Sequence, residues 1–238
     1  MKFRNHYKMG RQMYKAMAEN GIQLNEAAFV LGNLAPDMSL SCFYSRHSRE
    51  HSERRMARPL ARLYGGDYTN DSLVFSYSLG VMSHYICDFL CYSHTPAFKG
   101  DIQEHIRHEK YQAVSAAGML PFNVQENAGM DLPELKARLD AYISQQEQLL
   151  AQNPELAQND VFIAMHAAAW ASTGVWLHAG ESTAAINAPY RSDSAMIAET
   201  CFKALALAAR SVYTPVRGKS RYLRQGLGLV ASGVRSIV

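Results

Sequence analysis

The chain has 238 residues, of which 48% are hydrophobic and 19% are charged, and its formal net charge is +3. This length and apolar content are enough for one large domain with a full core, and they exclude an intrinsically disordered chain. The first residues lack the apolar core of a signal peptide, and the longest apolar run contains too many polar residues for a membrane span. Because the four cysteines also show no disulfide-framework spacing, we expect a cytoplasmic protein with reduced thiols.

Helical periodicity dominates the sequence, and no clear run of alternating Val, Ile and Thr is bounded by turn residues. The sequence therefore predicts an all-α fold. The first helix is expected over residues 5–19, with His6 at its start. A charged histidine is unfavourable at a helix N-terminus, so His6 is interpreted either as a neutral ligand or as an ordinary surface residue.

Residues 25–31 predict a short helix that ends at Gly32. A loop is expected from Gly32 to Asp37, because Pro36 disfavours helical geometry in the residue before it. Taken alone, Asp37 would be interpreted as a helix cap or a turn residue.

Two histidines, His47 and His51, lie four residues apart in the polar stretch SRHSREHSERR. If this stretch is helical, the two share a face, and only one of them needs a functional role. A solvated helix start is the alternative interpretation. Residues 65–67 then break the chain before the central helix.

An apolar run from Leu73 to Pro96 predicts the central helix, and it carries no charge before Asp88. His84 and Asp88 are four residues apart, so they project from one face of this helix. A buried carboxylate costs several kcal/mol unless it is paired or bound to a metal. His94 follows where the helix should end.

A second histidine–carboxylate pair, His105 and Glu109, has the same spacing and follows a break at residues 98–101. The connection over residues 118–133 contains Gly and Pro and is long for a compact domain, so we expect it to border a site. Further helices are expected over residues 135–151, 155–177, 192–213 and 221–238.

These polar residues share two ligand types, imidazole and carboxylate, which without thiolate suit zinc in a catalytic rather than a structural site. There are enough of them for more than one ion. The candidate metal ligands are His6, Asp37, His47 or His51, His84, Asp88, His94, His105 and Glu109.

The pattern resembles the zinc-dependent phospholipase C family, which is related to the S1/P1-type zinc nucleases. The resemblance rests on the order of these residues, the motif His84-x3-Asp88, the gap to His94 and the motif His105-x3-Glu109. The resemblance covers about residues 1–115. It implies one all-α domain, taken as residues 1–238, with two or three Zn²⁺ ions in a cleft between helices. It also implies hydrolysis of a phosphodiester by metal-activated water, with a phosphoester such as a phospholipid as the substrate.

The resemblance further implies how the ligands divide among the ions. The residues implied for the first zinc are Asp37, His84, Asp88 and either His47 or His51. The residues implied for the second are His94, His105 and Glu109. A third zinc would use His6 and a bridging Asp88. Secreted members of the family complete that site with a processed N-terminal Trp. In this chain the alternatives are the Met1 amine, a water molecule, or no third ion. Asp37 is also the implied general base.

Other protein classes could account for part of this pattern of histidines and carboxylates. A nuclease or nucleotide phosphodiesterase could use the same zinc cluster, and a non-catalytic, metal-stabilised helical scaffold is the alternative from another class. A phosphohydrolase of the HD type needs an adjacent His-Asp pair, and a ferritin-like di-iron protein needs Glu-x-x-His. Neither pattern occurs in the chain, so both classes are excluded.

The remaining polar features are given structural interpretations. Cys87 and Cys91 lie beside His84 and Asp88 and could ligate a metal, but a core role is the favoured interpretation, and His108 is assigned to a supporting or surface position. His166 and His178 are assigned structural roles. Residues 200–238 contain Lys and Arg but no acid, which makes this basic segment either a peripheral contact for acidic lipid or nucleic acid, or a solvated helix with a loose terminus.

Overall fold

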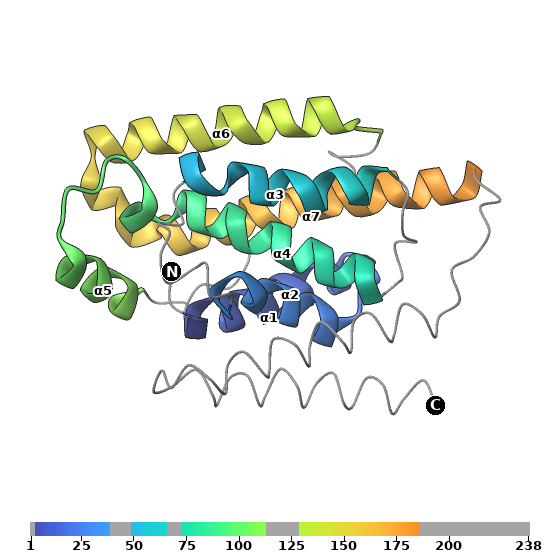
Figure 1. Cartoon of the computed structure of the whole chain (residues 1–238), viewed down its shortest axis with the longest axis horizontal. Helices are drawn as coiled ribbons and strands as arrows, with labels where there is room; N and C mark the ends of the chain where they lie inside the picture. Colours follow the sequence, from blue (N-terminus) through green and yellow to red (C-terminus); the bar gives the residue numbers. More distant parts are fainter. Residues whose placement is uncertain (1–2, 39–48, 66–72, 113–128, 186–238) are drawn as a thin grey trace.

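The computed structural model describes residues 3–38, 49–65, 73–112 and 129–185, and these residues form helices without a strand (Figure 1). The all-α prediction is therefore confirmed for this part of the chain. The helices are α1 (Phe3–Glu19), α2 (Glu26–Met38), α3 (Arg49–Tyr64), α4 (Leu73–Leu90), the 3₁₀ helix η2 (Tyr92–His94), α5 (Ile102–Tyr111), α6 (Leu132–Gln152), the 3₁₀ helix η4 (Pro154–Asn159) and α7 (Asp160–Ala185). The helices expected over residues 192–213 and 221–238, the basic segment and most of the connection over residues 118–133 lie outside these residues.

Helix α4 is the centre of the bundle and packs against α2, α7 and α3 (Figure 1). Its length and apolar composition are sufficient for a membrane span, but 78% of it is buried inside the protein, as expected for a core helix. The predicted central helix thus ends at Leu90, and η2 carries the chain to His94. The burial of α4 makes each of its polar side chains dependent on a partner from a neighbouring helix.

The closest helix contact joins α2 and α4 at two glycines. A Cβ on Gly32 would lie 2.0 Å from the carbonyl oxygen of Tyr77, and a Cβ on Gly80 would lie 2.1 Å from that of Phe29. The two backbones therefore touch where no side chain can be placed. This crossing fixes the position of the C-terminal half of α2 against the half of α4 that carries His84.

The prediction that the second helix ends at Gly32 is wrong. Helix α2 continues through Gly32 and Pro36 to Met38, so Asp37 lies in a helix and not in a loop. Gly32 is needed for close packing and does not terminate the helix. Pro36 lies near the helix end, where its missing N–H removes one hydrogen bond, and burial of the surrounding residues outweighs this loss.

Two further helices complete the frame of the site. Helix α7 presents small residues to α4, and the hydroxyls of Ser83 and Ser172 lie 2.9 Å apart at this contact. Helix α5 lies at one end of the bundle and is the shortest α-helix of the described residues (Figure 1). Its N-terminus carries a capping box, in which the Asp101 carboxylate accepts from Gln103 N and Glu104 N, and Glu104 accepts from Asp101 N.

Candidate metal centre

Four of the predicted ligands converge at the core of the bundle, and we call them the inner group: His6 from α1, Asp37 from α2, and His84 and Asp88 from α4. The ligand atoms of His6, Asp37 and His84 lie within 4.8 Å of one another. The Asp88 carboxylate contacts both imidazoles, with Oδ1 3.1 Å from His6 Nε2 and Oδ2 3.3 Å from His84 Nε2. The two rings stack with their centroids 3.9 Å apart.

The α2–α4 crossing orients His84. Its Nδ1 donates a hydrogen bond of 2.8 Å to the carbonyl oxygen of Asn33, the residue after Gly32. A neutral imidazole carries one N–H. In the neutral form of His84, the Nε2 atom therefore has a lone pair that faces the Asp88 carboxylate. A metal-ligating histidine is held in this way by its second ring nitrogen.

His6 is neutral at physiological pH, because burial, followed by its proximity to His84, lowers its pKa to about 4. Its Nδ1 atom is buried and has no hydrogen-bond partner among the described residues. Asp88 is fully buried, and burial alone would raise its pKa, but neighbouring positive charge lowers the pKa of this carboxyl well below its ordinary value. The inner group thus combines a neutral His6 imidazole with an ionised carboxylate.

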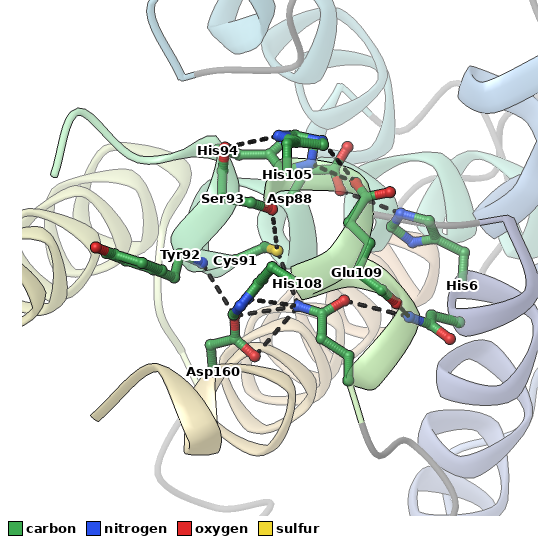
Figure 2. A network of polar contacts seen from close by, with 12 residues as sticks. His6, Asp88, Cys91, Tyr92, Ser93, His94, His105, His108, Glu109 and Asp160 are labelled. Atoms are coloured by element: carbon green, nitrogen blue, oxygen red, sulfur yellow. Dashed lines mark hydrogen bonds and ion pairs between the residues drawn. The ribbon is translucent and has the colours of Figure 1, made fainter. Parts of the chain in front are cut away.

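Three other predicted ligands form the outer group: His94 from η2, and His105 and Glu109 from α5. The Glu109 Oε1 atom lies 3.1 Å from His94 Nε2 and 2.9 Å from His105 Nε2. Figure 2 shows these side chains converging beside His6 and Asp88. The side chain of His105 is 26% exposed, whereas those of His6 and Asp88 are 0% exposed, so solvent reaches the centre from the outer side.

His105 is oriented in the same way as His84. Its Nδ1 donates to the carbonyl oxygen of Ser93 at 3.1 Å, which leaves Nε2 directed at Glu109. Burial alone would raise the pKa of Glu109, but nearby positive charge and the hydrogen bonds from His105 and His94 lower it well below its ordinary value. Burial lowers the pKa of His94, which favours its neutral form. The outer group therefore has the charge state that metal binding requires.

Both groups fit zinc. Ligand atoms around a tetrahedral zinc lie about 3.3 Å apart, close to the separations of Glu109 Oε1 from its two histidines, 2.9 and 3.1 Å. The donors are nitrogen and oxygen atoms, as in catalytic zinc sites. Two adjacent ions need a shared region of negative charge, and Asp88 and Glu109 supply it.

The structure leaves one predicted ligand unplaced. His47 lies outside the described residues, and His51 lies in the first turn of α3, with its side chain not described. The choice between these two histidines stays a prediction. His166 bonds through Nδ1 to the Phe162 carbonyl oxygen, and the His178 ring packs at 4.3 Å from that of Tyr64, which agrees with structural roles for both.

Sequence reasoning missed a second cluster beside the centre. Cys91 is buried in the core as expected, and its thiol also lies close to His108 and Asp160, with the three ligand atoms within 4.8 Å of one another (Figure 2). His108 was expected to support the ligands or to lie on the surface; it bonds to Asp160 at 2.8 Å. The sequence did not predict a role for Asp160. The only signal for this residue was its place after a 3₁₀ turn, at the start of a long apolar helix.

Comparison with known proteins identifies the class that this bundle and its ligands define. The family model described as zinc dependent phospholipase C matches residues 5–154 of the chain. The chain therefore belongs to the zinc-dependent phospholipase C family, which confirms the resemblance found in the sequence. Membership of this family supports zinc as the metal and phosphoester hydrolysis as the general activity. No curated protein and no solved structure matches the chain.

Proposed function

We propose that the chain hydrolyses a phosphodiester, with a phospholipid as the substrate class and with the inner and outer groups each holding zinc. The observation that carries the proposal is the proximity of two donor sets in which a carboxylate contacts Nε2 of a histidine whose Nδ1 is fixed by a backbone carbonyl oxygen. Bound zinc would supply a water of lowered pKa as the nucleophile and neutralise charge on the phosphoryl oxygens. The family match over residues 5–154 supports the same chemistry.

The residues of the chain have distinct tasks in this reaction. Asp37 is 9% exposed and lies at the edge of the inner group, where its carboxylate can orient the attacking water and accept its proton. Asp88 and Glu109 stay ionised and hold the histidines in position. His105, the most exposed member of the outer group, borders the side from which the substrate enters.

Asp37→Asn tests the assignment of the base. The variant keeps the shape and the oxygen donor of the side chain but cannot accept a proton, so hydrolysis should fall by about 10²–10⁴-fold while the zinc content stays near that of the wild type. Zinc is counted by elemental analysis, and turnover is measured on a chromogenic phosphodiester and on phosphatidylcholine vesicles. Asp131→Asn, which changes an exposed cap residue of α6, is the matched control.

The substrate panel separates this proposal from its alternatives. Cleavage of DNA or RNA without cleavage of phospholipid would favour a nuclease on the same cluster. Zinc-loaded protein that cleaves none of these substrates would indicate a metal-stabilised scaffold. Loss of zinc in Asp37→Asn in proportion to lost activity would make Asp37 a ligand and not the base.

A further inference from the structure

The cluster of Cys91, His108 and Asp160 does not belong to the centre described above. Cys91 precedes η2, His108 lies on α5 and Asp160 begins α7, so three separate elements contribute one donor each. Figure 2 shows the cluster next to the outer group, with no residue in common. Its donors are a sulfur, a nitrogen and an oxygen, whereas the inner and outer groups contain only nitrogen and oxygen donors.

An amide nitrogen lies in the middle of the cluster. Gln112 Nε2 is 3.0 Å from Cys91 Sγ, 3.1 and 3.3 Å from the two carboxylate oxygens of Asp160, and 3.4 Å from His108 Nε2. An amide group has two hydrogens, so it cannot donate to all four of these atoms. The position is one where a cation would satisfy the surrounding atoms better than a neutral donor does.

The charge of the cluster points in the same direction. Asp160 is 2% exposed, and within the described part of the chain its ion-pair partner is His108 and not a Lys or Arg. A buried carboxylate needs a counter-charge, which a divalent cation supplies directly. A thiol, an imidazole and a carboxylate together are a ligand set that selects zinc and similar transition metals over magnesium or calcium.

Each of the donors is held from outside the cluster. Tyr92 N donates to Asp160 Oδ2 at 3.0 Å, Ser93 Oγ lies 3.3 Å from Cys91 Sγ, and Asn5 Nδ2 donates to Gln112 Oε1 at 3.2 Å. Such contacts orient the ligands of metal sites. The cluster also has an entry path, because His108, Gln112 and Asp160 line an open cavity of about 1470 Å³ between α5, α6 and η4.

We propose that Cys91, His108 and Asp160 bind a thiophilic divalent metal ion of the zinc type, at a site separate from the hydrolytic centre. On binding, the Cys91 thiol loses its proton to solvent, the Gln112 amide moves away from the position of the ion, and water completes the coordination. The site anchors the start of η2 and the end of α5 to the first turn of α7. It does not depend on the proposed hydrolytic function.

Cobalt(II) is the probe that distinguishes this site from the hydrolytic centre. A thiolate ligand gives cobalt a near-ultraviolet charge-transfer band, and the nitrogen and oxygen donors of the inner and outer groups do not. The full chain is stripped with a chelator and titrated with Co²⁺, with the bound metal counted by elemental analysis. We expect the band to saturate at one cobalt per chain, and Cys91→Ser to abolish it and lower the bound cobalt by one equivalent.

Cys87→Ser is the matched control, because Cys87 is an equally buried thiol on α4 whose Sγ lies 3.8 Å from the Ala164 carbonyl oxygen and outside the cluster. This variant should keep the band. His108→Ala, which changes a partly exposed side chain, should weaken cobalt binding at this site at least about tenfold even if Cys91→Ser fails to fold. No band in the wild type at saturating Co²⁺, a band that survives Cys91→Ser, or an unchanged cobalt affinity in His108→Ala would overturn the proposal.

Discussion

The inner and outer groups have the same ligand types but are held in different ways. The inner group lies on three helices of the core and is oriented by the contact between the backbones of α2 and α4 at Gly32 and Gly80. The outer group lies on η2 and on α5, a helix at the end of the bundle that depends on its own capping box. The geometry of the inner group is thus fixed by global packing, and that of the outer group by local structure. Mutations in the two should separate stability from metal binding.

The largest expected effect is that of Asp88→Ala. The change leaves His6 and His84 buried without their shared carboxylate, so the metal-free protein should lose about 1–3 kcal/mol of unfolding free energy, and zinc bound at the inner group should be lost. His105→Ala should cost about 1 kcal/mol or less and remove only the outer zinc, because its side chain is partly exposed. Urea unfolding after chelation and elemental analysis measure the two effects. Equal destabilisation by both variants would contradict the distinction.

Gly32→Ala tests whether the helix crossing positions the inner group. The added methyl group would collide with the Tyr77 carbonyl oxygen, so α2 must move, at a cost of about 1–3 kcal/mol. Zinc affinity should fall as well, because Asn33 and Asp37 move with the helix. Gly10→Ala is the control: its Cβ would lie 3.3 Å from the Asn33 Cβ, a side-chain contact, and the gain in helix propensity offsets the tighter packing. Unchanged zinc affinity in Gly32→Ala would contradict this role.

The pH dependence of stability should also reflect the inner group. The pKa of His6 is about 4 in the folded chain and 6.5 as its ordinary value, so between these values the unfolded chain binds a proton that the folded chain does not. Stability from this residue is therefore complete above pH 6.5 and decreases as the pH falls toward 4, by up to about 1.4 kcal/mol per pH unit. Asp88 and Glu109, whose pKa values are lowered, add losses at still lower pH.

His6→Gln removes the His6 contribution. Urea midpoints of the chelated protein measured between pH 7 and 4 should therefore fall less steeply in this variant than in the wild type. The slope is the readout, so a lower starting stability of the variant does not affect the test. Parallel slopes in the two proteins would show that His6 titrates normally.

The sequence predicts well those site residues that a single helix brings together. The pairs His84–Asp88 and His105–Glu109 follow from helical periodicity alone, and the structure brings both residues of each pair into contact. The helix end at Gly32 was predicted wrongly, because glycine and proline signal a helix end locally and the tight contact with α4 is a property of the tertiary structure.

Convergence of separate elements is harder to predict from sequence. Cys91, His108 and Asp160 come together only because α4, α5 and α7 end or begin at the same place. No spacing rule relates residues on three different elements, so the sequence gives Cys91 and His108 separate interpretations and does not indicate Asp160. The same limit applies to the early histidine ligand, for which His47 is favoured as the first histidine after Asp37 and His51 stays the alternative.

The smallest expected effect concerns the capping box of α5. Asp101→Ala removes the acceptor for Gln103 N and Glu104 N, which costs about 1 kcal/mol at the start of the helix that carries His105 and Glu109. If local structure holds the outer group, this fraying should weaken zinc binding there. Where the whole 1 kcal/mol lost from the helix start is also lost from zinc binding, the affinity should fall by about five- to tenfold. A competition titration with a chromogenic chelator measures the weaker zinc site.

Asp131→Ala is the matched control for this last effect. Asp131 caps α6 by accepting from Glu134 N at 2.8 Å, so its loss removes the same type of bond from a helix that carries no member of either group. Both variants should lose a similar unfolding free energy, but only Asp101→Ala should lower the affinity for the outer zinc. An equal fall in affinity would mean that zinc binding follows global stability, and the outer group would then depend on the core as the inner group does.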